Sequence, residues 1–289
     1  MNLLKLFFPI PNLSNLNLEP SPPSSDPGKL FLNVCCDYLI IFLLMGPIGT
    51  GKSTFINSIR TTFQGYNCAS APSSSEIADG LGKDSYTLQL RSHKLRNGKD
   101  GFLPFVMIDT MGVEAGDSNG IHTDDIVSTL QGRIKDGYDF NPSAAIREKD
   151  PRYNHNPTMK DKIHCLVFVL PADKISMVDD DILKKMKTVR KRARDAGIPQ
   201  VVIMTMVDKA CPLVKDDLKK IYTSKKIKKK MEECSTKVGV PMNYIFPIKC
   251  YSEEVEPQVE IDALILMALT NMVNFANDYV EDQSEEEEE

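Results

Sequence analysis

The stretch that decides the fold reads G-P-I-G-T-G-K-S and spans residues 46–53. It matches the phosphate-binding pattern G-x-x-x-x-G-K-[ST]. Glycines let the backbone curl so that successive N–H groups point at phosphate oxygens, and the helix that follows aims its positive end at the same charge. An apolar run precedes the motif at 38–45, and a helix-like stretch follows it at 53–63. This strand–loop–helix context is what the motif requires, so the sequence predicts nucleotide binding.

Each position of the loop has an expected role. We expect the Lys52 ammonium to neutralise the β- and γ-phosphates. We expect the Ser53 hydroxyl to ligate Mg²⁺, which prefers oxygen ligands and bridges phosphates. The residues expected to bind phosphate are Gly46, Ile48, Gly49, Thr50, Gly51, Lys52, Ser53 and Thr54.

A second motif, D-x-x-G, is expected on the metal side of a GTPase site. The pattern occurs three times, but only Asp109-Thr110-Met111-Gly112 directly follows an apolar strand. We therefore expect Asp109 to hold Mg²⁺ through water and the Gly112 N–H to sense the γ-phosphate. A strand-end Asp in an ordinary turn is the alternative. The candidates for the switch hydroxyl on Mg²⁺ are Ser75, Ser85 and Thr87.

The base-binding motif departs from its usual form. Guanine recognition needs a carboxylate after a later strand, usually in the pattern [NT]-K-x-D, to accept hydrogen bonds from the base. Here the apolar run 201–204 leads into Thr205-Met206-Val207-Asp208. Met206 can cover the base as an apolar lid but cannot donate a hydrogen bond. Guanine is favoured over adenine, with Asp208 as a helix N-cap as the alternative. The residues expected at the base are Thr205, Asp208, Lys249 and Cys250.

Hydrolysis is expected to be slow. Many small GTPases place Gln directly after D-x-x-G to orient the attacking water, and here that residue is Val113. Valine cannot orient water. Glu114 follows it but would need a different geometry, so no catalytic residue is assigned. Turnover would need another group or a partner protein.

Apolar runs of strand length alternate with helix-period stretches along most of the chain. Runs that are apolar at every position suit strands of a parallel sheet covered on both faces. Strands are expected at 38–45, 103–109, 163–170, 201–206 and 244–248, and helices at 53–63, 123–135, 181–196, 218–238 and 259–280. The sequence therefore predicts an α/β class: a three-layer P-loop GTPase-like fold with a mostly parallel sheet.

One pair of strands breaks this alternation. Residues 85–95 have strand character, and Asn97-Gly98 is a strong turn signal. The strand at 103–109 follows with no room for a helix between them. We therefore expect one antiparallel hairpin strand within the otherwise parallel sheet.

Composition divides the chain into three parts. Residues 1–36 are rich in Pro, Ser and Asn, so we expect a flexible N-terminal arm. Residues 37–282 form the predicted GTPase-like domain, with a surface insertion or mobile loop at 137–161. Residues 283–289 form an acidic tail. Seven of the 40 acidic residues lie in 281–289, and 35 Lys and Arg nearly balance the rest. A near-neutral body does not indicate a nucleic-acid partner.

Cysteine use and the basic stretches bear on compartment and partners. The seven Cys lack C-x-x-C spacing and no signal peptide is recognised, which suits reduced thiols in the cytoplasm. No apolar run reaches the roughly 18–20 residues of a membrane helix, so no transmembrane segment is expected. The basic stretches at 184–194 and 215–230 are expected to be solvated helix faces. Contact with nucleic acid or anionic lipid is not favoured.

Four stretches together resemble one known family. They read G-P-I-G-T-G-K-S-T-F-I-N-S-I from residue 46, L-P-F-V-M-I-D-T-M-G from 103, D-K-I-H-C-L-V-F-V-L from 161 and T-M-V-D from 205. They look like the interferon-induced protein 44 and 44-like family over about residues 38–282. The resemblance implies a cytoplasmic, interferon-responsive antiviral or antiproliferative protein that binds GTP, with protein partners in immune signalling. It also implies that residues 49–53 hold phosphate, Asp109 serves the metal and Asp208 serves the base.

Two functions from different classes follow. The first is a switch or slow GTPase, with Mg²⁺ and GTP or GDP as ligands. The second is a non-enzymatic immune scaffold whose degenerate GTPase-like domain binds nucleotide weakly, which Met206 and Val113 favour. An ATP-using enzyme fits less well, because no second constellation of catalytic carboxylates is apparent.

Overall fold

The computed structural model describes residues 39–68, 88–97, 101–116 and 119–288. These residues fold around a six-stranded sheet with the order β2-β3-β1-β4-β5-β6. Only β2 and β3 pair antiparallel. The strands are β1 (Ile40–Met45), β2 (Arg91–Arg96), β3 (Phe102–Asp109), β4 (Cys165–Pro171), β5 (Gln200–Thr205) and β6 (Ile245–Pro247). The predicted fold class, a mostly parallel GTPase-like sheet with one antiparallel strand, is confirmed.

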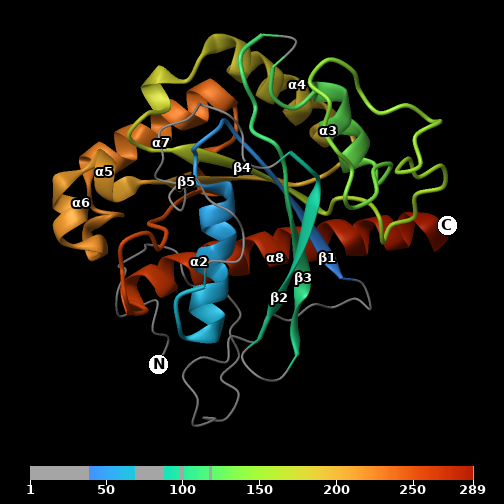
Figure 1. The fold of residues 1–289 in the computed structure, drawn as a ribbon. Helices are drawn as coiled ribbons and strands as arrows, with labels where there is room; N and C mark the ends of the chain where they lie inside the picture. The colour runs from blue at the N-terminus through green and yellow to red at the C-terminus, as the bar shows by residue number, and fades with distance from the viewer. Residues whose placement is uncertain (1–38, 69–87, 98–100, 117–118, 289) are drawn as a thin grey trace.

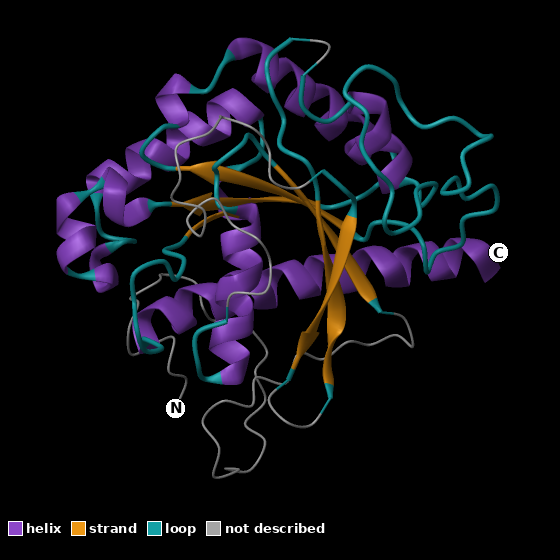
Figure 2. Cartoon of the chain, in the orientation of Figure 1, coloured by secondary structure: helices purple, strands orange, loops and turns teal. Residues whose placement is uncertain are grey.

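Helices cover both faces of the sheet and make three layers (Figure 1). The two helices α2 and α8 lie on one face, and α3, α4 and α7 lie on the other (Figure 2). The helices are α2 (Lys52–Gln64), α3 (Thr123–Leu130), α4 (Asp180–Asp195), α5 (Val207–Ala210), α6 (Pro212–Asp216), α7 (Lys225–Val238) and α8 (Val259–Glu288).

Burial explains why the central strands are apolar throughout. Every residue of β4 is buried, and β1 and β5 are buried at all positions but one each. Both faces of a parallel sheet are covered by helices, so alternate positions cannot be polar as they are in a half-exposed strand. Because β1, β3, β4 and β5 run in the same direction, their carboxyl ends meet at one edge. That edge is where ligands bind in open α/β sheets.

The hairpin is present but shorter than predicted. Its first strand, β2, begins at Arg91, and residues 85–87 of the predicted strand lie outside the described residues. Among the described residues before it, 88–90 pair with 137–140: the N–H of Leu90 donates to the Tyr138 carbonyl, and the N–H of Phe140 donates to the Leu88 carbonyl, both at 2.9 Å. The insertion at 137–161 holds no helix or strand, yet this pairing and its buried side chains tie it to the sheet.

Two predicted helices have different bounds for local reasons. The first, α3, ends at Leu130 and not at residue 135, because Gly132 takes a left-handed φ of 73° and a Cβ there would lie 2.7 Å from the Asp161 carbonyl carbon. The stretch 218–238 divides into a single 3₁₀ turn (Leu218–Lys220) and α7, since the Ser224 side chain caps the start of α7. The short helices α5 and α6 were not predicted.

The last helix runs beyond its predicted end at 280 and continues to Glu288, through most of the stretch expected as an acidic tail. No transmembrane segment was expected, but among the described residues Val259–Glu285 of α8 is long and apolar enough to cross a membrane, by length and composition alone. Its apolar side, which includes the fully buried Leu264 and Met272, packs against β1 and β4. In this fold α8 is therefore a core helix. The predicted arm at 1–36 lies outside the described residues.

The Ser224 cap provides a test of the fold. Its Oγ accepts a hydrogen bond from the Ile227 N–H at 3.3 Å, and Ser224 is buried. We expect Ser224→Ala to lower the free energy of unfolding by about 1 kcal/mol, the usual cost of losing an N-cap. Urea denaturation measures this. Thr236→Ala, at an exposed position inside α7, should change stability by less than half as much. Equal effects of the two changes would contradict the assignment of the cap.

Candidate functional site

The loop between β1 and α2 has the shape that its glycines impose. A Cβ on Gly46 would lie 2.2 Å from the Val169 carbonyl oxygen of β4, so no larger residue fits. Gly49 and Gly51 adopt left-handed φ angles of 72° and 93°, which side-chain-bearing residues rarely take. The loop lies at the carboxyl edge of the sheet and leads directly into the N-terminus of α2.

Lys52 lies under this loop. Its Nζ donates to the carbonyl oxygens of Gly46 at 3.0 Å and Pro47 at 3.2 Å. Burial lowers the pKa of this ammonium, and the nearby Asp109 carboxylate opposes the shift. The positive end of the α2 dipole and a buried ammonium therefore act at the same loop, an arrangement suited to an anion.

The two residues predicted on the metal side lie together. The Ser53 Oγ, in the first turn of α2, donates a hydrogen bond of 2.6 Å to Oδ2 of Asp109, the last residue of β3. A hydroxyl and a carboxylate are oxygen ligands of the kind that Mg²⁺ prefers. Within the described ranges, no three His, Cys, Asp or Glu side chains converge on a metal site. The pair suits an ion that takes its remaining ligands from phosphate and water.

The segment after Asp109 is attached to the phosphate-binding loop. The Val113 N–H donates to the Gly46 carbonyl at 3.0 Å. A Cβ on Gly112 would lie 2.5 Å from Cγ1 of Ile48, so the two segments touch at a glycine. Val113 itself is 1% exposed and faces away from solvent. Its side chain is therefore unable to reach an attacking water.

A cavity of about 200 Å³ joins the phosphate-binding loop to the predicted base-binding segments. It is lined by Gly49, Gly51, Thr54, Thr205, Met206, Asp208, Lys209, Cys250 and Ser252. The Thr205 hydroxyl links the two parts, because its Oγ1 donates to the Thr50 carbonyl at 2.7 Å. Three segments far apart in the sequence thus line one cavity, next to the site expected for phosphate.

Met206 occupies the position of the usual lysine in an unusual conformation. Its φ of 57° is the one left-handed value among non-glycine residues in the described part of the chain. It precedes α5 and serves as the N-cap position of that helix, so the alternative reading of Asp208 as the N-cap is wrong. Met206 lines the cavity with Asp208, and its role as an apolar lid stays a prediction.

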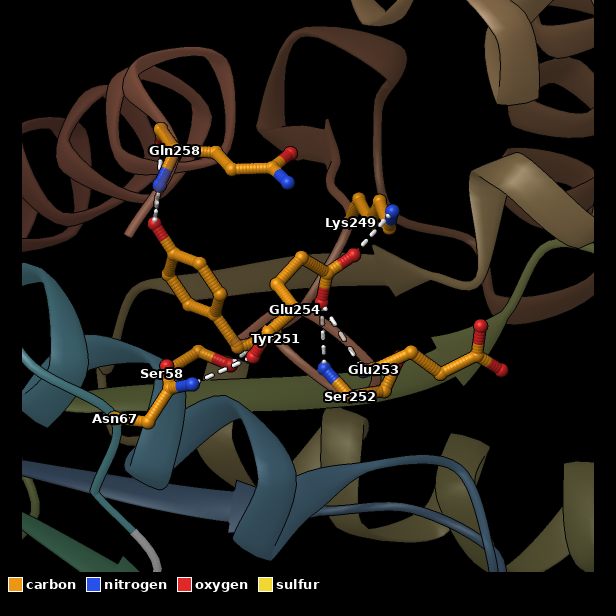
Figure 3. A network of polar contacts seen from close by, with 8 residues as sticks. All are labelled: Ser58, Asn67, Lys249, Tyr251, Ser252, Glu253, Glu254 and Gln258. Carbon is orange, nitrogen blue, oxygen red and sulfur yellow. Dashed lines mark hydrogen bonds and ion pairs between the residues drawn. The ribbon is translucent and has the colours of Figure 1, made fainter. Parts of the chain in front are cut away.

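The loop after β6 is held in place by a network of polar contacts (Figure 3). The Tyr251 N–H donates to Ser58 Oγ of α2 at 2.9 Å, and the Tyr251 hydroxyl accepts from the Gln258 N–H at 2.7 Å. Lys249 pairs with Glu254 at 2.5 Å. The Lys249 side chain is therefore engaged within its own loop, and Lys249 does not line the cavity.

Cys250 brings a thiol to the cavity wall. Burial raises the pKa of this thiol to about 12, so it stays neutral at physiological pH. It presents a small, uncharged surface to the cavity.

Most of the predicted residues lie together, and Lys249, which pairs with Glu254 and does not line the cavity, is an exception. The phosphate-binding loop, Asp109, Gly112, Thr205, Asp208 and Cys250 converge on one edge of the sheet, and their roles in ligand binding stay predictions. The switch candidates Ser75, Ser85 and Thr87 lie outside the described residues. Lys209 and Ser252 line the cavity but were not predicted. Their positions directly after Asp208 and within the loop that follows β6 are the only sequence signals that point to them.

The sheet order, the loop after β1 and the Asp at the end of β3 define the P-loop GTPase-like class. No protein-family model matches the chain. The chain is 36% identical over 244 residues to interferon-induced protein 44 from Homo sapiens. It is 32% identical over 241 residues to the Mus musculus protein of that name, and 32% over 249 residues to human interferon-induced protein 44-like.

Over this region the chain is similar to interferon-induced protein 44 and 44-like, which agrees with the resemblance that its motifs indicate. The matched region is 83–86% of this chain, and the chain spans about half the length of these relatives, 53–55%.

The structures of two GTP-binding proteins align with most of this chain. The probable GTP-binding protein engB covers 82% of this chain and 98% of its own, with 14% identity and a TM-score of 0.43. Translation elongation factor SelB from Methanococcus maripaludis covers 83% of this chain and 34% of its own, with 14% identity and a TM-score of 0.36.

Glu254 offers a pH-dependent test of the loop. Burial alone would raise the pKa of Glu254, but hydrogen bonds from Lys249 and the Ser252 backbone lower it overall. A carboxyl with a lowered folded-state pKa stabilises the fold above its ordinary pKa, 4.5, and this stabilisation is lost as the pH falls through the folded-state value.

We expect Glu254→Gln to cost roughly 1.5–3 kcal/mol at pH 7, the range for hydrogen bonds to charged groups. The difference from wild type should narrow as the pH falls below 4.5. Thermal unfolding at a series of pH values measures both. The exposed neighbour provides the control, since Glu253→Gln should leave the curve unchanged. A difference that does not vary with pH would contradict the role of the charge.

Proposed function

We propose that this chain binds a guanine nucleotide with Mg²⁺ and acts as a GTP-dependent switch or a slow GTPase. The observation that carries the proposal is the cavity shared by Gly51 of the phosphate-binding loop, Asp208 and Cys250. A phosphate loop alone suits any nucleoside triphosphate. A carboxylate in a cavity next to that loop is what a guanine N1–N2 edge needs, because both of its groups are donors.

The chain's own residues divide the task. The N–H groups of the curled loop and the N-terminus of α2 would receive the phosphate oxygens. Lys52, which now donates to two loop carbonyls, would turn its charge to the β- and γ-phosphates. Ser53 and Asp109, 2.6 Å apart, would hold the Mg²⁺ that neutralises charge on those phosphates. Gly112, tied to the loop through Ile48, would respond to the γ-phosphate.

Slow hydrolysis follows from the residue after Gly112. Val113 is buried and bonded through its N–H to Gly46, so its side chain has no means of orienting water. The neighbouring Glu114 is half-buried. Turnover would therefore depend on a group supplied by a partner, and the bound triphosphate would persist without one.

A second candidate function is a non-enzymatic immune scaffold with a degenerate GTPase-like domain that binds nucleotide weakly. The observation in its favour is Met206, which lines the base cavity where a lysine would usually lie along the base. A thioether gives contact area but no charge and no donor. In this case the fold would present a partner surface whether or not a nucleotide is bound.

The setting proposed for either function is the cytoplasm of cells responding to interferon, with antiviral or immune-signalling protein partners. The names of the relatives support the proposal that the protein acts in cells responding to interferon. The five cysteines in the described ranges are all free thiols, which supports a reducing compartment. If the setting is right, the transcript should rise when cells of the source organism are treated with interferon.

Nucleotide binding is tested by calorimetry with GTP, GDP and ATP in the presence of Mg²⁺. We expect wild type to bind GTP at least ten-fold more tightly than ATP. Lys52→Ala should weaken GTP binding roughly ten- to hundred-fold, because it removes charge-assisted hydrogen bonds to phosphate. Lys187→Ala, at an exposed position on α4, is the matched control and should leave affinity unchanged. Equal affinity for ATP and GTP would sink the guanine assignment.

Base recognition is tested at Asp208 and Met206. Asp208→Asn should shift preference from guanine toward xanthine nucleotides, since an amide can donate where the carboxylate only accepts. Met206→Lys should tighten GTP binding several-fold if Met206 limits affinity in the proposed site. The control is Met177→Lys, because Met177 is 81% exposed and does not line the cavity. If Asp208→Asn leaves the ratio of GTP to XTP affinity unchanged, the base contact is wrongly assigned.

A further inference from the structure

The first two turns of α7 concentrate positive charge. Lys225, Lys226, Lys228 and Lys229 are all exposed there, and the first turn carries no acidic residue. Cations at a helix N-terminus oppose the helix dipole, and lysines three or four residues apart repel each other. Lys225 and Lys229 have that spacing, and so do Lys226 and Lys229. These charges disfavour the helix that carries them, so the stability of the fold gives no reason for them.

Acidic residues neutralise only some of these lysines. The two glutamates of α7 pair with Lys228 at 4.0 Å and with Lys230 at 3.2 Å. Lys225, Lys226 and Lys229 form no ion pair with any residue in the described ranges. We call these three residues the lysine face. Its charge is therefore available to a partner that carries negative charge.

An exposed apolar side chain lies next to the lysine face. Leu213, in the short helix α6, is 60% exposed. The Sγ of Cys211, the N-cap residue of α6, lies 3.4 Å from the Oγ of Ser224, the N-cap residue of α7, so the two helices begin side by side. Leu213 comes two residues after the first of these caps, and Lys225 directly follows the second.

The helices around this contact gather at one end of the molecule. The helices α5, α6 and α7 lie together there (Figure 1). A leucine exposed to solvent and three lysines without acidic partners therefore belong to one surface. The sequence alone favours a solvated helix face, because it does not show that Leu213 adjoins the lysines.

The chemistry of this surface suits an anionic membrane better than a nucleic acid. Lysines are attracted to anionic lipid head groups, and an exposed apolar side chain can enter the boundary between head groups and acyl chains. Proteins that bind single-stranded nucleic acid stack bases on aromatic rings or on arginine. The stretch 209–230 contains no arginine, and its one aromatic residue, Tyr222, is half-buried with its hydroxyl donating to the Met267 sulfur at 3.6 Å.

We propose that Leu213 and the lysine face dock this protein onto the surface of a membrane that contains anionic lipid. The three ammonium groups would lie among the negatively charged head groups, and the leucine side chain would enter the interface beside them. Such contact is peripheral and reversible, and salt weakens it because ions screen exposed charges. The docking surface does not include the phosphate-binding loop, so it does not depend on the proposed nucleotide binding.

The proposal is tested by sedimentation of the full chain with lipid vesicles. The vesicles consist of phosphatidylcholine alone or of phosphatidylcholine mixed with the anionic lipid phosphatidylserine. We expect the wild type to bind the mixed vesicles at low salt and to leave them at high salt. Binding to pure phosphatidylcholine should be weaker by roughly ten-fold or more. Failure of the wild type to bind the mixed vesicles would overturn the inference.

The lysine face is tested by replacing all three of its residues with Gln. This change should weaken binding to the mixed vesicles by roughly ten-fold or more, since each lysine near an anionic surface adds to the attraction. The matched control replaces the exposed Lys94, Lys135 and Lys149 with Gln, which removes the same charge elsewhere. It should change binding by about three-fold or less. An equal loss in both variants would mean that net charge alone drives binding, against the proposal.

The apolar contact separates a membrane from a nucleic acid. Leu213→Ser should weaken vesicle binding several-fold, whereas Val255→Ser, at a residue that is 87% exposed in another loop, should not. Both positions are exposed, so neither change should impair folding. Binding of a labelled single-stranded RNA, measured by fluorescence anisotropy, should be weaker than binding of the mixed vesicles. Tighter binding of RNA, together with vesicle binding that Leu213→Ser leaves unchanged, would replace the membrane with a nucleic-acid partner.

A last variant separates this surface from the nucleotide site. Lys52→Ala should bind the mixed vesicles like wild type, whether or not the wild type binds GTP. A loss of vesicle binding in a folded Lys52→Ala variant would contradict the independence of the docking surface.

Discussion

The rest of the site depends on the lack of space around Gly46. Its Cα lies so close to the Val169 carbonyl of β4 that a methyl group would overlap it. The Gly46 carbonyl also accepts from the Val113 N–H and from the Lys52 ammonium. One glycine thus joins the phosphate-binding loop to the sheet, to the metal-side segment and to the buried cation. The contacts with the sheet and with the metal-side segment restrict the loop before any anion binds, and donors that are already restricted lose little free energy on binding.

Buried charge gives this loop its chemical character. Lys52 is 8% exposed, and removing an ammonium from water is unfavourable unless other groups satisfy it. Two carbonyls do so here, with Asp109 nearby, and burial still lowers the pKa of the amine. A phosphate would supply a full negative charge in place of carbonyl dipoles. The fold therefore keeps its cation in an arrangement that an anionic ligand can improve.

The sequence predicted most of what is set by local pattern. Apolar runs predicted the strands at 163–170 and 201–206, and a fixed motif spacing predicted the loop at 46–53. Both signals are local, so they do not depend on distant parts of the chain. The lengths of elements were predicted wrongly where a distant segment decides them: α3 ends at Leu130, two residues before Gly132, whose backbone passes close to Asp161. Contacts such as Tyr251 with Ser58 join residues almost two hundred positions apart, and no single-sequence pattern encodes them.

Met206 is unusual both in the sequence, where it replaces a lysine, and in the structure, where its φ is left-handed. A left-handed backbone is unfavourable for a residue with a side chain, and strain of this kind persists only where the surroundings impose it. Here Thr205 is held to the phosphate-binding loop on one side and α5 begins on the other, so the backbone at 206 must turn sharply. The turn leaves Met206 and Asp208 at the wall of one cavity although the lysine is absent. In the proposed nucleotide site the backbone of this turn would therefore set the geometry at the base, and the Met206 side chain would contribute contact area alone.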